Sequence, residues 1–136
     1  MKKHIIFTIA TSCFASFATN AMTYNEGIEN VRKIESSYNK CLIAENSTHD
    51  IDHAECADTS QKQYDKLIVS IRKQYPKAVD PKVWQSINLG HIERTKACRN
   101  DYNYLMTRVY YVKPNILCEQ QAYKSLALSA IKLHLK

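Results

Sequence analysis

The stretch YDKLIVSIRKQYPKAVDPKVW, residues 64–84, decides the fold class. As far as Tyr75 its apolar side chains recur at steps of three and four residues, which is typical of one face of an α-helix. Pro76 then stops this helix. Asp80 and Pro81 start the next one, because Asp caps a helix N-terminus and Pro fits the first helical position. The stretch therefore predicts two consecutive helices and favours an all-α chain.

Apolar stripes on either side continue the same pattern. They predict a first helix over residues 24–45, followed by a loop at 46–48. The third helix is predicted to run from Pro81 as far as Tyr111, with Pro114 ending it, and a fourth to begin at about Asn115. The four stripes comprise Ile28, Val31, Ile34, Tyr38 and Leu42; Tyr64, Leu67, Ile68, Ile71 and Tyr75; Trp84, Ile87, His91, Thr95, Cys98 and Tyr102; and Ala122, Leu126, Ala130 and Ile131. Four helices with short connections most economically form an up-down four-helix bundle.

The N-terminus has the pattern of a secretory signal peptide. Lys2 and Lys3 precede an apolar run over residues 5–17, and small side chains follow up to Ala21. We expect cleavage after Ala21, which divides the chain into a signal peptide, 1–21, and one helical domain, 22–136. A retained membrane anchor and lipid attachment at Cys13 are the alternatives, but the apolar run is shorter than the roughly 18–20 residues of a membrane span. The sequence therefore predicts a periplasmic or secreted protein without a stable membrane anchor.

Four cysteines remain after removal of the signal peptide: Cys41, Cys56, Cys98 and Cys118. An even number of cysteines in a small exported domain predicts two disulfides. A metal site is the alternative, but no Cys-x-x-Cys pair of the kind used by zinc sites is present. In an up-down bundle all four cysteines fall toward one end. The spacing leaves their pairing open, although joining 41 to 56 and 98 to 118 closes the shorter loops.

Charge is unevenly distributed along the chain, which has 19 Lys and Arg, 13 Asp and Glu and a formal net charge of +6. Residues 42–60 contain no Lys or Arg, whereas residues 61–82 and the C-terminal stretch are basic. The acidic residues of 42–60 are Glu45, Asp50, Asp52, Glu55 and Asp58. An acidic end on a basic molecule can steer a cationic protein toward it, although ordinary solvated surface is the simpler interpretation.

The arrangement of the cysteines and their neighbours resembles the LprI-like lysozyme-inhibitor family. The resemblance covers about Tyr38 to Leu133. It rests on Cys41, Cys56 with Tyr64, Asp65 and Leu67 on its helix, Arg94 four residues before Cys98, and Cys118 at the head of a last helix. The chain departs from the family where Ile68 replaces an Asn, and near Ile87 and Gly90, where the family's Gln and Trp are missing.

The resemblance implies a periplasmic protein that binds lysozyme or another wall-cleaving enzyme. We expect the partner-binding residues at the acidic end: Glu45, His49, Asp50, Asp52, His53 and Glu55. An immunity protein against a rival bacterium's secreted effector would need the same compartment and the same kind of surface. A non-inhibitory envelope accessory protein is the third hypothesis.

Enzymatic chemistry fits the sequence less well than protein binding. His49 and His53 are four residues apart and could form a weak metal site, but the His-Glu-x-x-His order of a hydrolytic zinc helix is missing. Neither a Gly-x-Ser-x-Gly elbow nor a Gly-rich phosphate loop is present, and His91 is expected to be a core or boundary residue. We therefore expect no catalytic residues, no cofactor and no metal.

Clustered aromatic residues offer an alternative binding surface. Tyr102, Tyr104, Tyr110 and Tyr111 lie near Arg99 and Arg108, and such residues can form an interface hot spot, although bundle core is the commoner role. Nucleic acid is an unlikely partner for an exported chain whose basic residues alternate around its helices.

Overall fold

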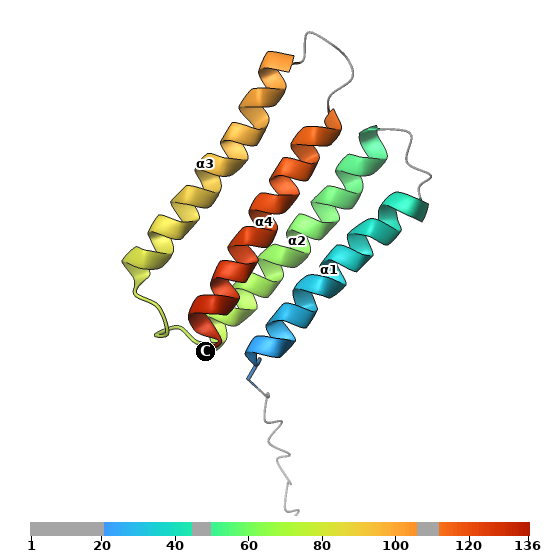
Figure 1. The fold of residues 1–136 in the computed structure, drawn as a ribbon. Helices are drawn as coiled ribbons and strands as arrows, with labels where there is room; N and C mark the ends of the chain where they lie inside the picture. The colour runs from blue at the N-terminus through green and yellow to red at the C-terminus, as the bar shows by residue number, and fades with distance from the viewer. Residues whose placement is uncertain (1–20, 45–49, 106–111) are drawn as a thin grey trace, which may run out of the picture.

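The fold is a four-helix up-down bundle, as predicted. The computed structural model describes residues 21–44, 50–105 and 112–136, without the side chains of residues 44, 50–52, 100–105 and 112–114. Its helices alternate in direction along the bundle (Figure 1). They are α1 (Tyr24–Ala44), α2 (Asp50–Gln74), α3 (Pro81–Leu105) and α4 (Val112–His134).

The last helix, α4, is the common neighbour of the other three. It packs against α2, α3 and α1, and in Figure 1 it lies between α2 and α3. No Cα atom in the described part of α3 comes within 8 Å of a Cα atom of α1 or α2. Small buried side chains on α4, at Ala122, Ala127 and Ala130, let the neighbouring helices approach closely. In its backbone packing the bundle is therefore a three-helix unit, α1, α2 and α4, with α3 packed on α4 and its side chains, such as Trp84, reaching the shared core.

The predicted apolar stripes supply the core. Ile71 of α2 and Ile131 of α4 are fully buried, and Val31, Ile34 and Trp84 are also inside. Burial of such large apolar side chains stabilises the fold by roughly 1.5–3 kcal/mol each. The stripes of all four helices thus meet in one interior, which confirms the periodicity argument.

Local hydrogen bonds fix two helix starts. At α1 the backbone N–H of Thr23 donates to the Glu26 carboxylate at 2.7 Å, and the N–H of Glu26 donates to Thr23 Oγ1 at 3.3 Å. This reciprocal capping box holds the pKa of the Glu26 carboxyl below its ordinary value. At α3 the N–H of Lys82 donates to Asp80 Oδ1 at 2.7 Å, so Asp80 is the predicted cap and Pro81 the first helical residue.

The predicted boundary of the fourth helix was wrong. The helix begins at Val112, not at about Asn115, and Pro114 lies in its first turn. Proline is tolerated there because the first backbone N–H groups of a helix have no intrahelical acceptor. The predicted run of the third helix to Tyr111 and the loop at 46–48 lie outside the described residues.

The end of the bundle that contains Met22, Tyr75, Trp84 and Leu135 is called the open end here. The N–H of Met22 donates to Gln74 Oε1 at 2.9 Å, and the Tyr75 hydroxyl donates to the Met22 carbonyl at 3.1 Å. Trp84 packs edge-on against His134 with ring centroids 5.5 Å apart, and the Arg72 guanidinium lies 4.8 Å from the Trp84 ring centre. Side-chain packing and hydrogen bonds, without a disulfide among the described residues, therefore hold the helices together at this end.

Candidate functional site

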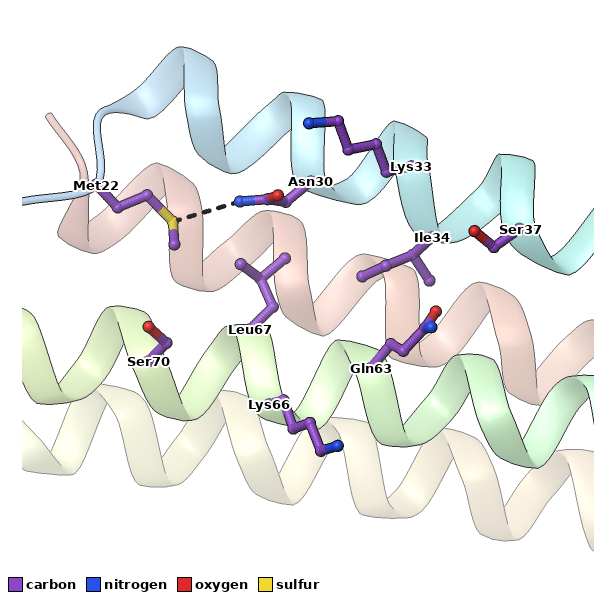
Figure 2. A pocket seen from close by; sticks show the side chains of 9 residues that line it. All are labelled: Met22, Asn30, Lys33, Ile34, Ser37, Gln63, Lys66, Leu67 and Ser70. Carbon is purple, nitrogen blue, oxygen red and sulfur yellow. Dashed lines mark hydrogen bonds between the residues drawn. The ribbon is translucent and has the colours of Figure 1, made fainter.

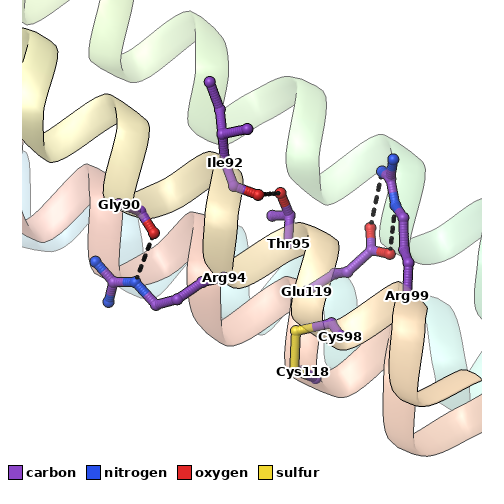
Figure 3. The surroundings of a disulfide bond; sticks show 8 residues. All are labelled: Gly90, Ile92, Arg94, Thr95, Cys98, Arg99, Cys118 and Glu119. Atoms are coloured by element: carbon purple, nitrogen blue, oxygen red, sulfur yellow. Dashed lines mark hydrogen bonds and ion pairs between the residues drawn. A yellow bond between two sulfur atoms is a disulfide. The ribbon is translucent and has the colours of Figure 1, made fainter.

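The opposite end of the bundle carries both disulfides and is called the stapled end here. Cys41–Cys56 joins α1 to α2 with a Cα–Cα distance of 5.8 Å, and Cys98–Cys118 joins α3 to α4 at 5.7 Å (Figure 3). The Gln120 amide, two residues after Cys118, donates to the carbonyl of Ala57, the residue after Cys56, at 2.8 Å. The two bridges thus lie at the same level, and the predicted pair of disulfides is confirmed.

A polar layer crosses the interior beside the disulfides. The buried Ser60 hydroxyl donates to Gln120 Oε1 at 3.0 Å, which links α2 to α4. A cavity of about 140 Å³ lies next to this link, with Ser60 and Gln120 in its lining. The ion pair of Lys124 and Glu35, whose charged atoms are 2.5 Å apart, also lines it. Burial, with a smaller effect from Glu35, raises the pKa of Tyr64 to about 12. The buried Tyr38 hydroxyl at this cavity has no hydrogen-bond partner within the described ranges.

A hollow of about 230 Å³ opens between α2 and α4 at the stapled end. Its apolar lining comes from Ala54, Ala57 and Ile116, and its polar lining from Asp58, Gln61, Asn115 and Glu119. Asp58 pairs with Lys62 at 2.5 Å, and Glu119 pairs with Arg99 at 2.9 Å (Figure 3). The Asn115 amide nitrogen is buried and has no acceptor in the part of the chain described. The hollow thus combines an apolar surface with carboxylates and an unused donor.

The structure brings part of the predicted partner-binding set to this end. Asp50 and Asp52 lie in the first turn of α2, although their side chains are not among those described. His53 is half-buried and Glu55 is exposed, on either side of Ala54, which lines the hollow. Glu45 and His49 lie outside the described residues. The described members of the set thus lie at the stapled end, their role in partner binding stays a prediction, and the sequence analysis did not predict the hollow.

The alternative tyrosine surface can be followed only in part. Tyr102 and Tyr104 belong to α3, without described side chains, and Tyr110, Tyr111 and Arg108 lie outside the described residues. Arg99 extends from α3 to Glu119 of α4, where it forms two hydrogen bonds, at 2.9 and 3.3 Å. Arg99 is therefore part of the edge of the hollow.

His91 is buried between α3 and α4, as expected of a core or boundary residue. Its ring packs edge-on against Tyr123 with centroids 4.7 Å apart, and Nδ1 has no hydrogen-bond partner in the described ranges. Burial lowers the pKa of His91 most strongly, while the Ala122 backbone and Asp65 act in the opposite direction. The packing of α3 on α4 therefore favours the neutral form of the ring.

A second depression, a groove of about 370 Å³, lies between α1 and α2 (Figure 2). The two helices line it with equivalent positions over two turns each, and Met22 stands at one end (Figure 2). These positions are Asn30, Lys33, Ile34 and Ser37 on α1 and Gln63, Lys66, Leu67 and Ser70 on α2. The sequence analysis missed the groove because its polar residues look like solvated surface. The sequence signal that could have revealed the groove is the matched spacing of its lining residues, which follow Asn30 on α1 and Gln63 on α2 by three, four and seven positions.

The described parts of the chain hold no group of three or more His, Cys, Asp or Glu side chains arranged to bind a metal ion. Among the helices described, none is long and apolar enough to cross a membrane. Comparison of the chain with protein-family models, curated proteins and solved structures finds no match. The resemblance to the LprI-like family therefore stays a prediction.

Proposed function

We propose that this protein is exported, binds a basic protein at its stapled end, and thereby inhibits a wall-cleaving enzyme of the lysozyme type. The hollow between α2 and α4 carries the proposal, because apolar side chains and the carboxylates of Asp58 and Glu119 line it together. Arg and Lys side chains have the complementary composition, an apolar stem and a cationic head. A cationic side chain of a partner therefore fits this place.

Two independent features support export. The N-terminal residues have the charge and apolar pattern of a signal peptide. Disulfides such as Cys41–Cys56 and Cys98–Cys118 form and persist mainly in oxidising compartments. Together they favour the periplasm or the outside of the cell, where wall-cleaving enzymes act.

The disulfides also hold the proposed docking surface in place. Ala57 directly follows Cys56, and Glu119 directly follows Cys118, so each wall of the hollow is next to a covalent bridge. A surface that is already ordered loses less conformational entropy when a partner binds. The two disulfides therefore favour binding at this end by lowering its entropy cost.

One carboxylate in the hollow is readily available to a partner. Asp58 pairs with Lys62, and their side chains are 61% and 69% exposed. An exposed ion pair contributes only about 0–1 kcal/mol, so a partner's cation can replace Lys62 at little cost. Glu119 is 15% exposed and accepts two hydrogen bonds from Arg99, so it adds negative charge to the hollow while keeping its own cation. Glu55 adds an exposed carboxylate without a cation beside it in the described ranges. Because the whole chain carries a net charge of +6, binding of a basic partner depends on this local acidity.

An inhibition titration tests the proposal. The protein would be purified from the periplasm of an expression host, with both disulfides formed, and added to a vertebrate lysozyme acting on bacterial cell walls. We expect inhibition that weakens as salt is raised and that is lost when Glu55 and Asp58 are both replaced by Lys. The control variant replaces Glu29 and Glu93, two exposed carboxylates outside the hollow, by Lys. It makes the same change in net charge and should leave inhibition intact.

Each outcome separates one part of the proposal. No inhibition at high micromolar protein would discard lysozyme as the target, and equal loss in both double variants would discard the hollow as the docking site. Binding that leaves wall hydrolysis intact would instead favour a non-inhibitory envelope accessory protein. A toxin gene beside this one would favour an immunity protein.

A further inference from the structure

We infer that the groove between α1 and α2 is a second protein-binding surface, which takes a partner segment with one or two apolar side chains flanked by carboxylates. This surface is separate from the hollow at the stapled end. Its partner segment is acidic, whereas the partner proposed for the hollow is basic. The inference rests on the apolar floor of the groove, the cations at its edges and its length.

The floor of the groove is apolar and its length is defined. Ile34 and Leu67 face each other across the two helices and close the bottom, with 8% and 7% of their surfaces exposed (Figure 2). The lining positions cover residues 30–37 and 63–70, which at 1.5 Å per residue gives a length of about 10 Å. A volume of about 370 Å³ is at the lower end of the range for binding pockets and suits one or two apolar side chains.

The edges of the groove are cationic. Lys33 and Lys66 stand on opposite sides of the floor, both exposed, and neither has an ion-pair partner in the described ranges (Figure 2). No Asp or Glu is among the residues that line the groove. By contrast, carboxylates hold Lys62, Arg99 and Lys124 elsewhere on the bundle. The groove thus offers two positive charges across an apolar strip, which complements an acidic segment with an apolar centre.

The same charges and shape argue against other occupants. A second copy of this chain seated groove to groove would bring Lys33 and Lys66 against like charges, which is unfavourable. An acyl chain would keep one side in water, because the groove is open to solvent along its length. Small side chains, Ser70 at the Met22 end and Ser37 at the opposite end, leave room for backbone to approach, which suits a peptide segment (Figure 2).

Peptide titration followed by two-dimensional amide NMR tests this inference on the disulfide-bonded protein. The probe is the synthetic peptide Glu-Asp-Glu-Leu-Phe-Glu-Asp-Glu. One control peptide carries Gln and Asn in place of the acids, and another carries Ala-Ala in place of Leu-Phe. We expect shifts at residues 30–37 and 63–70 with the first peptide and binding weaker by about ten-fold or more with either control.

Protein variants separate the groove from general charge attraction. Lys33→Glu with Lys66→Glu should abolish the shifts, and Ser37→Phe, which fills the groove without changing charge, should also weaken binding. Lys77→Glu with Lys82→Glu alters net charge equally at exposed positions outside the groove and should leave binding intact. Circular dichroism would confirm that each variant is folded.

Several results would overturn the inference. These are shifts outside the groove, equal binding of the uncharged peptide, and no shifts at millimolar peptide. Preferential binding of dodecyl phosphate below its micelle concentration would replace the protein partner by a lipid-like one, and a concentration-dependent dimer in sedimentation would replace it by a second copy. The stapled-end double variant Glu55→Lys, Asp58→Lys should bind the peptide unchanged, so failure of the enzyme-inhibition proposal is distinguishable from failure here.

Discussion

At the stapled end of the bundle two disulfides lie beside a polar layer, whereas at the open end no disulfide joins the described residues and large apolar side chains fill the core. The buried polar side chains near the disulfides are Ser60 and Gln120, which link α2 to α4 and require correct hydrogen-bond geometry. The open end is mainly apolar, with Ile131, Leu135 and Trp84 inside, and its buried polar side chain, His134, bonds only within its own helix, to the Ala130 carbonyl. The difference teaches that a small bundle can keep a polar interior where covalent links restrict the chain.

Reduction of both disulfides should give the largest effect. The bridges close loops of 15 and 20 residues, and each should contribute about 3 kcal/mol to the free energy of unfolding, or about 6 kcal/mol together. Since small domains are stable by only about 5–15 kcal/mol, the reduced protein should be close to unfolding. Urea denaturation of the oxidised and reduced forms checks this. Equal midpoints would show that the polar layer holds without the staples.

A cavity at the open end should have the next largest effect. Ile131→Ala removes a fully buried side chain and should lower the free energy of unfolding by about 3–4 kcal/mol in the oxidised protein. Leu117→Ala, at a position 51% exposed, is the control and should change it by less than about 0.5 kcal/mol. A small effect at Ile131 would mean that the disulfides stabilise both ends of the bundle.

The two glycines offer a smaller test, of close packing. A Cβ at Gly27 would lie 3.0 Å from Ile131 Cγ1 and 3.0 Å from Leu135 Cδ1, so Gly27→Ala should destabilise by about 1–2 kcal/mol. A Cβ at Gly90 meets nothing nearer than the Arg94 guanidinium at 4.0 Å, so Gly90→Ala should stabilise the helix by up to about 1 kcal/mol. Thermal melts of both variants should therefore shift in opposite directions, and a shared direction would contradict the packing described.

The pH dependence of His91 should be the smallest effect, because Asp65 and the Ala122 backbone oppose the influence of burial. The pKa of His91 is lowered in the folded protein from 6.5, so the unfolded chain takes up the proton first. The stability from neutral His91 is therefore complete above about pH 6.5 and is lost as pH falls through the folded pKa. Melting temperatures measured from pH 7.5 to 5 should fall less in His91→Phe than in the parent protein. An identical slope would show that His91 titrates normally.

The fold could be predicted from the sequence because its signals are local. The stripes of Val31 to Ile34 and of Tyr64 to Ile71 became core, and Asp80 with Pro81 started a helix as predicted. Pro114 was misinterpreted because proline is common both in the first turn of a helix and just after the end of the previous one. The central place of α4 was not predicted, because it depends on contacts between residues far apart in the chain.

The candidate site was only partly predictable for the same reason. The sequence indicated an acidic end at the disulfides, because the lack of Lys and Arg over residues 42–60 can be read directly from the order of residues. The hollow requires α2 and α4 to meet, with Ala57 and Ile116 side by side. The groove requires Lys33 and Lys66 to lie at its opposite edges, one on each helix. Such pairings depend on tertiary register, which periodicity does not fix.

The central place of α4 has a consequence for the order in which the chain folds. Ribosomes make this helix last, so the earlier helices lack their common neighbour until residues 112–134 have emerged. The cysteines of the described residues nevertheless pair with their neighbours in the sequence, Cys41 with Cys56 and Cys98 with Cys118. In an exported chain, oxidation in the order of emergence would therefore give the native bridges without reshuffling. The contacts of α1, α2 and α3 with α4 would form only after residues 112–134 have been made.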